Sequence, residues 1–193
     1  MNRKAYDIDL ERLREFVSGK RLLVTGAGGS IGSEISGQLL ELDPAVLMRF
    51  DVIVFLLFEI ERELKERESG TKLIAVTGDV EKTEDIRKAI EDAGAIDIIY
   101  HAAAYKHVDL MEGNSIACFE NNVIGTAKLA EVAEEKEVGQ FVLVSTDKAV
   151  RPTSLMGASK RLVEMVLIDR PQKGTQFRTV RLAPHPTRGP QAA

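Results

Sequence analysis

The chain has 193 residues, of which 44% are hydrophobic and 29% charged, the balance of an ordinary globular protein with one core. Its net charge of −4 offers no basic surface for nucleic acid, and its longest apolar run, residues 52–58, is too short to span a membrane. Cys118 is the only cysteine, so no internal disulfide can form, and the charged residues 1–4 do not resemble a secretory signal. We therefore expect a cytoplasmic protein in a reducing compartment.

The spacing of apolar residues predicts strands and helices that alternate along the chain. A short charged helix is expected to lead in over residues 1–20, and residues 183–193, which are rich in proline, are expected to form a disordered tail. Between them we predict strands over 22–25, 45–50, 73–76, 96–100, 141–144 and 177–182, and helices over 31–42, 59–68, 83–94, 115–137 and 155–169. In the helix over 115–137, the inward positions are expected to be Ile116, Phe119, Val123, Ala127 and Ala130.

Continuous apolar strands that alternate with helices are typical of a parallel sheet covered on both faces. We therefore expect an α/β fold, with a doubly wound parallel sheet of the Rossmann type. The chain is expected to form a single domain, with the dinucleotide-binding part over residues 21–182.

A glycine-rich turn follows the first predicted strand and predicts dinucleotide binding. Glycines let the backbone approach a pyrophosphate, and the free N–H groups at the helix start bind its charge. Asp51 ends the second strand, nineteen residues after Gly32, where a carboxylate can accept hydrogen bonds from a ribose diol. This favours NAD, because a 2′-phosphate would be repelled, with NADP left open. The alternative is a tight turn without a ligand. The turn residues are Gly26, Gly28, Gly29, Ser30, Ile31 and Gly32.

Two further segments fall at the ends of predicted strands. Asp79 and Val80 follow the third strand, where Asp79 can either accept from the adenine amino group or cap the next helix. Ala102, Ala103 and Ala104 follow the fourth strand. Their small side chains would let a cofactor lie flat against the sheet edge, or would allow tight packing of strand and helix. Both interpretations are compatible with cofactor binding at this edge.

A reactive segment follows the fifth strand. Asp147 and Lys148 set a carboxylic acid beside an amine, and Lys160 lies four residues after Met156, on the same face of a predicted helix. A thioether has no proton to give, so Met156 cannot act as an acid or a base. His101 and His107 are six residues apart with no third ligand nearby, so we expect no metal site.

Taken in order, these motifs resemble those of the extended short-chain dehydrogenase/reductases. The similarity is closer to the UDP-N-acetylglucosamine 4,6-dehydratases of capsule and polysaccharide biosynthesis, some of which also have Met where their relatives have Tyr. The resemblance covers residues 15–181. It is carried by the segments Thr25–Glu34, His101–Val108, Leu110–Glu112, Asn121–Asn122, Gly125–Thr126, Ser145–Val150 and Met156–Lys160.

The resemblance implies a reaction in which NAD⁺ takes a hydride from C4 of the sugar and returns it to C6. Lys148 would remove the C5 proton, which requires a pKa lowered by burial or by Lys160, and Asp147 would protonate the departing C6 hydroxyl. Thr146 would bind the C4 oxygen. Lys160 would hold the nicotinamide ribose and place positive charge near C4.

Further roles follow from the same resemblance. Tyr105, Lys106 and His107 would either contact the UDP-sugar substrate or form the solvated start of a loop. Asn122 would also contact the substrate, and the chain would form a homo-oligomer through helices of its sheet. Met156 would pack against substrate or core and contribute position, so Asp147, or a water that it holds, would take the C4 hydroxyl proton.

The chain differs from the family pattern in two places. Val52–Val54 replace a polar stretch, and these residues are expected either to extend the second strand or to be exposed near the adenosine pocket. Relatives continue past the sixth strand into a substrate lobe, which we expect this chain to lack. Two alternatives to the dehydratase therefore stay open: a dinucleotide-binding module without turnover, and a UDP-sugar 4-epimerase, although an epimerase has no need of an acid at C6 or a base at C5.

Overall fold

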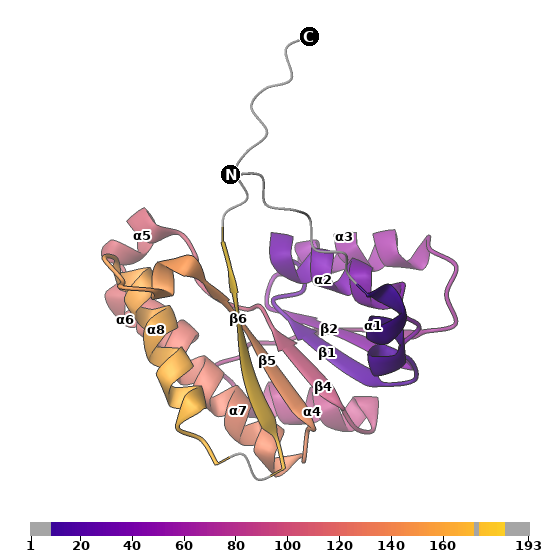
Figure 1. The fold of residues 1–193 in the computed structure, drawn as a ribbon. Helices are drawn as coiled ribbons and strands as arrows, with labels where there is room; N and C mark the ends of the chain where they lie inside the picture. The colour runs from indigo at the N-terminus through magenta and orange to yellow at the C-terminus, as the bar shows by residue number, and fades with distance from the viewer. Residues whose placement is uncertain (1–8, 172–173, 184–193) are drawn as a thin grey trace.

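The computed structural model describes residues 9–171 and 174–183, and these form one parallel sheet with helices on both faces (Figure 1). The strand order is β3-β2-β1-β4-β5-β6. The chain starts in the middle of the sheet, moves outward to β3 and then returns to β4 beside β1, which confirms the doubly wound Rossmann prediction. The strands are β1 (Arg21–Thr25), β2 (Val46–Asp51), β3 (Lys72–Thr77), β4 (Ile98–His101), β5 (Gln140–Thr146) and β6 (Gln176–Leu182).

The main helices divide between the two faces of the sheet (Figure 1). One face carries α1 (Leu10–Val17), α2 (Ser30–Leu40) and α3 (Val54–Lys65), and the other carries α4 (Thr83–Ala93), α7 (Thr126–Glu135) and α8 (Leu155–Ile168). Shorter helical segments complete the described chain: α5 (Val108–Glu112), α6 (Ser115–Phe119), the π-helical η1 (Glu120–Gly125) and the 3₁₀ turn η2 (Asp147–Ala149). Among the described helices, none has the length and apolar character required to cross a bilayer.

Two hydrophobic cores follow from the alternation of side chains along each strand. Leu23 of β1 faces the core beneath α4, α7 and α8, whereas its neighbours Leu22 and Val24 face the core beneath α1, α2 and α3. All three side chains are fully buried. The central strands are therefore apolar on both faces, which is why they appear in the sequence as continuous apolar runs.

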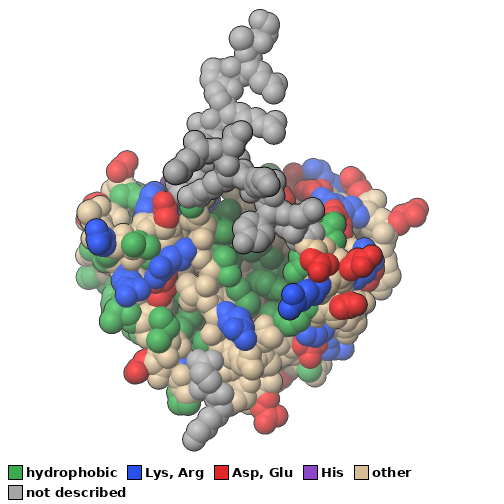
Figure 2. All heavy atoms as spheres, viewed as in Figure 1, with side chains coloured by type: hydrophobic (Ala, Val, Ile, Leu, Met, Phe, Trp, Pro, Cys, Tyr) green, Lys and Arg blue, Asp and Glu red, His purple; other side chains and the backbone are tan. Residues whose placement is uncertain are grey.

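An apolar groove lies between α1 and α2 on one side and strands β4 to β6 on the other. Its walls include Phe16 of α1 and, from the sheet, Tyr100, Val142 and Val180. Figure 2 shows hydrophobic side chains gathered near the middle of the face that Figure 1 presents. The sheet is thus covered less completely at β6, where Val180 is 48% exposed, than at its centre.

The segment after Asp51 resolves the alternative that the sequence left open. The strand stops at Asp51 because the Asp51 Oδ1 atom accepts the N–H of Ile53 at 2.9 Å and turns the chain into α3. Helix α3 therefore begins at Val54, five residues before the predicted start at residue 59. Val52, Ile53 and Val54 are exposed at this turn instead of extending the strand.

The long helix predicted over 115–137 is interrupted by the π-helical η1. A π-helical turn contains more residues than an α-helical turn, so the inward face rotates along the segment. Val123 and Ala130 are buried as predicted, and Ala127 is half-buried. The prediction of an inward Ile116 and Phe119 is wrong, because these side chains are 73% and 45% exposed.

The two ends of the chain are only partly described. The lead-in helix predicted within 1–20 appears as α1, and residues 1–8 lie outside the described residues. The tail predicted over 183–193 also lies outside them, apart from Ala183.

Candidate functional site

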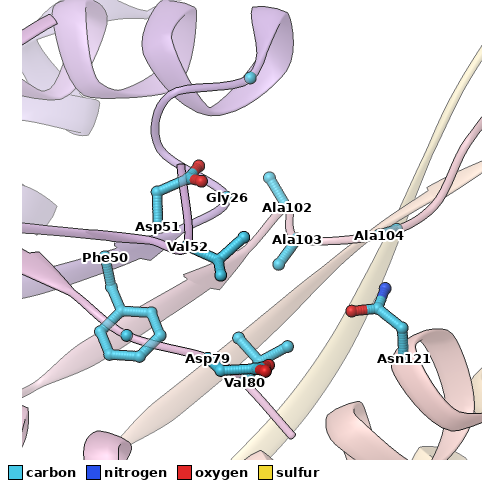
Figure 3. Close-up of a pocket in the computed structure, with 12 residues that line it drawn as sticks. Gly26, Phe50, Asp51, Val52, Asp79, Val80, Ala102, Ala103, Ala104 and Asn121 are labelled. Atoms are coloured by element: carbon cyan, nitrogen blue, oxygen red, sulfur yellow. The ribbon is translucent and has the colours of Figure 1, made fainter. Parts of the chain in front are cut away.

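A pocket lies at the carboxyl edge of the sheet, where the chain leaves β1 and β4 in opposite directions (Figure 3). This switch point is where ligands bind in open α/β sheets. The lining comes from the turns after four strands and from η1: Gly26, Gly29, Phe50, Asp51, Val52, Gly78, Asp79, Val80, Ala102, Ala103, Ala104 and Asn121. The structure thus brings together eight of the residues that the sequence assigned to a cofactor.

At two positions of the glycine turn a side chain would collide with backbone atoms, and at Gly28 it would collide with the Leu56 side chain. Gly26 has φ +67°, and a Cβ atom there would lie 2.5 Å from the backbone N of Ala103. A Cβ atom on Gly32 would overlap the carbonyl oxygen of Gly26. The absence of a side chain at Gly26 therefore lets the turn approach the segment after β4, and its absence at Gly32 lets α2 pack directly against the turn.

The start of α2 is suited to an anion. Its N-cap, Gly29, makes no side-chain capping hydrogen bond, and the first turn has no acidic residue. Ser30 and Ile31 are exposed beside it. Backbone N–H groups at this end are thus left to a ligand, and the helix dipole favours a phosphate there.

Asp51 connects the glycine turn to the second strand. Its Oδ2 atom accepts the N–H of Gly28 at 2.9 Å, while Oδ1 accepts the N–H of Ile53. The side chain is 8% exposed and lies at the pocket wall (Figure 3). Each carboxylate oxygen has a second lone pair, so the group can still accept from a ribose diol.

Asp79 and Val80 form the floor of the same pocket. The Asp79 carboxylate accepts the N–H of Glu81 at 2.9 Å, and its own N–H donates to Asp85. The N-cap residue of α4 is Lys82, so Asp79 shapes the turn before the helix and does not cap the helix itself. Its side chain lies at the wall of the pocket.

Asn121 is a pocket residue that sequence reasoning missed. It lies across the pocket from Asp51 (Figure 3), and its Nδ2 atom donates to the Asn122 Oδ1 atom at 3.0 Å. The sequence did show two successive asparagines, but only Asn122 was assigned a role. The π-helical turn η1 is what directs Asn121 into the pocket, and the sequence gives no signal for that turn.

Asn122 occupies a different place from the expected one. It is 1% exposed, and its carboxamide accepts from the Tyr105 N–H at 2.8 Å and donates to the Tyr105 carbonyl at 3.0 Å and to the Ser159 Oγ atom at 2.9 Å. The side chain is therefore occupied by protein groups. It ties the loop after β4 to α8 and thereby positions that loop.

The loop after β4 carries the other residues predicted to meet a substrate. Tyr105, Lys106 and His107 are all exposed, between Ala104 and the start of α5. Within the described part of the chain, no group of three acidic, histidine or cysteine side chains is placed to hold a metal ion. The loop thus offers a cation and an imidazole next to the pocket.

Residues 145–148, which we call the reaction strip, end β5 and enter η2. Thr146 Oγ1 donates to Asp147 Oδ1 at 3.0 Å and accepts the Lys148 N–H at 3.3 Å. Asp147 and Lys148 are exposed, so the burial expected for Lys148 is not provided by the described residues. A Cβ atom on Gly157 would lie 2.5 Å from the Lys148 carbonyl oxygen, so this glycine lets α8 press against the strip.

Lys160 and Met156 lie beneath the strip on α8. Lys160 is 6% exposed, and its Nζ atom donates to the Val144 carbonyl at 3.2 Å. Burial lowers the pKa of Lys160 to about 8, against the opposing effects of Cys118 and Glu164. Met156 is 3% exposed in a small cluster with Met111 and Cys118, so it packs in a core.

His101 ends β4 and is completely buried behind the pocket. Thr126 Oγ1 donates its only hydrogen to the Asn122 carbonyl at 2.7 Å, so it must accept from His101 Nε2 at 2.8 Å. His101 Nδ1 then accepts from Thr25 Oγ1 at 2.6 Å. Burial, together with the charge of Lys160, lowers the pKa of His101 to about 3, and the ring stays neutral.

The chain is similar in sequence to proteins of a known family. The profile of the polysaccharide biosynthesis protein family matches residues 22–183. An uncharacterized membrane protein of Methanocaldococcus jannaschii is 40% identical, over 88% of this chain and 50% of its own length. The capsular polysaccharide biosynthesis protein CapD of Staphylococcus aureus is 38% identical, over 94% of this chain and 31% of its own.

Two enzymes of named activity are also similar. A UDP-glucose 4-epimerase of Rickettsia canadensis is 30% identical, over 83% of this chain and 46% of its own length. The structure of DesIV, a dTDP-glucose 4,6-dehydratase of Streptomyces venezuelae with bound NAD, superposes with a TM-score of 0.73 at 27% identity, over 83% of this chain and 55% of that one. The chain thus spans about half or less of the length of these relatives.

The buried His101 predicts a specific pH dependence of stability. Its pKa is about 3 in the folded chain and about 6.5 when unfolded, so the unfolded state binds more protons between these values. The free energy of unfolding should therefore fall as the pH drops from 6.5 towards 3, by about 1.4 kcal/mol per pH unit from this residue. Urea unfolding at several pH values measures the slope. In His101→Gln, which cannot titrate, the slope of unfolding free energy against pH should be smaller by about 1.4 kcal/mol per pH unit. Equal slopes for the variant and the parent chain would contradict the assignment.

Proposed function

Because the chain belongs to the polysaccharide biosynthesis protein family, we propose that it carries the NAD-dependent half of a sugar-nucleotide 4,6-dehydratase that acts on UDP-N-acetylglucosamine or a similar UDP-sugar. The observation that carries this proposal is the reaction strip. Asp147 and Lys148 project from the end of β5, next to β4, whose end lines the pocket. They place an acid and an amine beside a site suited to a dinucleotide.

The proposed cofactor site fits NAD along the carboxyl edge of the sheet. The start of α2, with Ser30 and Ile31, would receive the pyrophosphate, and Asp51 would bind the adenosine ribose. Ala102–Ala104 would support the ring system, and Lys160 would approach the nicotinamide ribose. Bound NAD⁺ supplies a hydride acceptor that can later return the hydride to the sugar, while the protein residues handle the protons.

Two proton transfers are assigned to the reaction strip. Lys148 would remove the C5 proton, which a 4-keto group acidifies, and Asp147 would protonate the leaving C6 hydroxyl. Thr146, bonded to Asp147, would bind the C4 oxygen. Each positioned acid or base contributes about 10²–10⁴-fold to such reactions. Lys106 and His107 would contact the sugar nucleotide from the loop after β4.

The opening oxidation needs a base for the C4 hydroxyl. Met156 is buried among Met111 and Cys118, so its position agrees with a packing role. Asp147, or a water that it holds, is the proposed base. Lys160, with a pKa of about 8, would place positive charge nearby and favour loss of the proton.

A UDP-sugar 4-epimerase is the second candidate, supported by the 30% identity to the Rickettsia canadensis epimerase. Both reactions begin with oxidation at C4. The presence of an acid and an amine together in the strip favours the dehydratase, because epimerisation needs neither elimination at C6 nor deprotonation at C5. A third candidate is a dinucleotide-binding module without turnover, since the pocket is lined mainly by residues of the proposed cofactor site.

The dehydratase proposal predicts loss of water from the substrate. In D₂O, incubation with UDP-N-acetylglucosamine and NAD⁺ should give a product lighter by one water that carries deuterium at C5, detected by mass spectrometry. Lys148→Met should slow C5 exchange by about 10²-fold or more. Lys136→Met, which removes an amine at the C-terminal end of α7 that pairs with Glu91, should leave it unchanged.

The other results of this assay separate the alternatives. An isomer of unchanged mass would indicate the epimerase, and NAD⁺ binding without any product would indicate the module. A chain that does not bind NAD⁺ would contradict all three candidates.

Asp51 predicts the preference for NAD⁺ over NADP⁺. Asp51→Asn keeps an acceptor for Gly28 or Ile53 but removes the charge that favours a ribose diol and repels a 2′-phosphate. The variant should bind NAD⁺ about tenfold more weakly, a loss of about 1.4 kcal/mol, and discriminate less against NADP⁺. Titration calorimetry with both dinucleotides measures this change. Asp43→Asn, at a surface ion pair with Arg14, is the control, and equal affinities in Asp51→Asn and the parent chain would refute the assignment.

We also propose that two copies associate through the exposed apolar surface of α6, η1 and α8. Ile116 is 73% exposed, and Phe119, Ile124 and Leu162 are exposed around the same groove. Apolar patches of this kind mark interfaces. Light scattering after gel filtration should give the mass of a dimer or larger oligomer, and Ile116→Asp should shift it towards the monomer. Leu110→Asp, on α5, should not; a monomeric parent chain would contradict the proposal.

A further inference from the structure

We propose that Glu164 is the positioning residue that holds the reaction strip against α8 and β6. The inference rests on the proposed function for the meaning of the strip, but its geometric evidence is independent of the substrate. From the sequence, Glu164 is expected on the exposed side of its helix, and this prediction is wrong because the residue is 1% exposed.

The Glu164 carboxylate is surrounded by donors. Oε1 accepts from Ser145 Oγ at 2.7 Å and from Arg181 Nε at 2.8 Å, while Oε2 accepts from Arg181 Nη2 at 2.6 Å and from Arg161 Nη1 at 3.2 Å. The Arg181 pair is bidentate, the strong form of this interaction. Four donors fill the acceptor positions of one carboxylate.

Because Glu164 is buried, its charge depends on all of these donors for compensation. Its side chain is 1% exposed, and it lies one layer below the surface, beneath the partly exposed guanidinium groups of Arg161 and Arg181. Burial alone would raise the pKa of Glu164, but its hydrogen bonds with Arg181, Ser145 and Arg161 lower it to about 2. The group therefore stays ionised at neutral pH, and losing one partner would leave a buried charge uncompensated.

These bonds join three elements at the point where the strip begins. Ser145 is the next-to-last residue of β5, directly before Thr146. Glu164 belongs to α8, and Arg181 belongs to β6, where it pairs in register with Ser145. The Ser145 hydroxyl is therefore occupied by its hydrogen bond to Glu164. The side chains of the strip that stay available to a ligand are those of Thr146, Asp147 and Lys148.

Lys160, which belongs to α8 like Glu164, holds Val144, the residue before Ser145 in β5. One turn before Glu164, its Nζ atom donates to the Val144 carbonyl at 3.2 Å. Successive residues of β5 are therefore each fixed by α8, the first through its backbone and the second through its side chain. This double attachment determines where Thr146 emerges, and Thr146 in turn holds Asp147 and the Lys148 N–H.

The charge of Glu164 also reaches Lys160. The groups that act on the Lys160 ammonium are Cys118 from α6, Glu164 from α8 and the neutral His101 from β4. Cys118 and Glu164 both favour the protonated amine, and Glu164 is ionised at neutral pH. Removing its charge should therefore lower the titration midpoint of Lys160, an effect that loss of packing alone would not produce.

Glu164→Gln tests the proposal, because it keeps the size of the side chain and removes its charge. The matched control is Glu135→Gln, which removes the carboxylate from another Arg–Glu pair, with Arg87, on the surface between α4 and α7. Amide hydrogen exchange should be more than tenfold faster at Thr146–Lys148 in Glu164→Gln and unchanged there in Glu135→Gln. NMR of ¹³Cε-labelled lysine, assigned with Lys160→Met, should show the Lys160 midpoint lowered by half a pH unit or more.

Turnover provides the second readout. Glu164→Gln should lower kcat for dehydration at least tenfold while KM and the NAD⁺ affinity stay within threefold. Arg181→Lys, which keeps a charge for Glu164, should retain more activity than Arg181→Met. A lower melting temperature with unchanged strip exchange and an unchanged Lys160 midpoint would overturn the proposal and leave Glu164 a purely structural residue. If the parent chain produces no dehydration, the proposed function fails, and the exchange and NMR results still decide the role of Glu164.

Discussion

In a parallel sheet all strands end at the same edge, and every functional feature of this protein depends on that constraint. The glycine turn, Asp51, Asp79, the three alanines and the reaction strip follow five different strands and are separated by up to 122 residues in sequence, from Gly26 to Lys148. They meet only because β1 to β5 run in the same direction. The pocket opens where β1 and β4 lie side by side and their connections diverge to opposite faces.

Behind this edge lies a layer of buried polar side chains that fixes the surface residues. His101 joins β1, β4 and α7 through two threonines, Asn122 joins η1 to the loop after β4 and to α8, and Glu164 joins α8 to β5 and β6. Each of these groups would be costly to bury without its partners. The partners therefore restrict the backbone to one arrangement. Because the exposed groups of the site are attached to this backbone, the same bonds fix their positions.

The sequence predicted the fold well where local signals agree. The six strands lie near their predicted positions, and for the central strands the reason is that parallel strands inside a sheet are apolar on both faces. Helices α2 and α4 lie near theirs because glycines mark the turns beside them. The prediction was wrong where a side chain redirects the backbone. Asp51 turns the chain at Ile53, so α3 starts early despite a run of β-branched residues. Helix 115–137 contains a π-helical turn that no local pattern marks, and its apolar face rotates away from Ile116 and Phe119.

The sequence by itself determined the chemical inventory: a glycine turn, an acidic residue nineteen positions later, and an acid, an amine and a lysine near one strand end. These are properties of residue type and spacing, which the chain carries before it folds. Only the tertiary structure decided which side chains face outward. It turned Asn121 into the pocket and Asn122 away from it, placed Met156 in a core and exposed Lys148. Those outcomes depend on contacts between elements far apart in sequence, and burial is set by such contacts rather than by residue type.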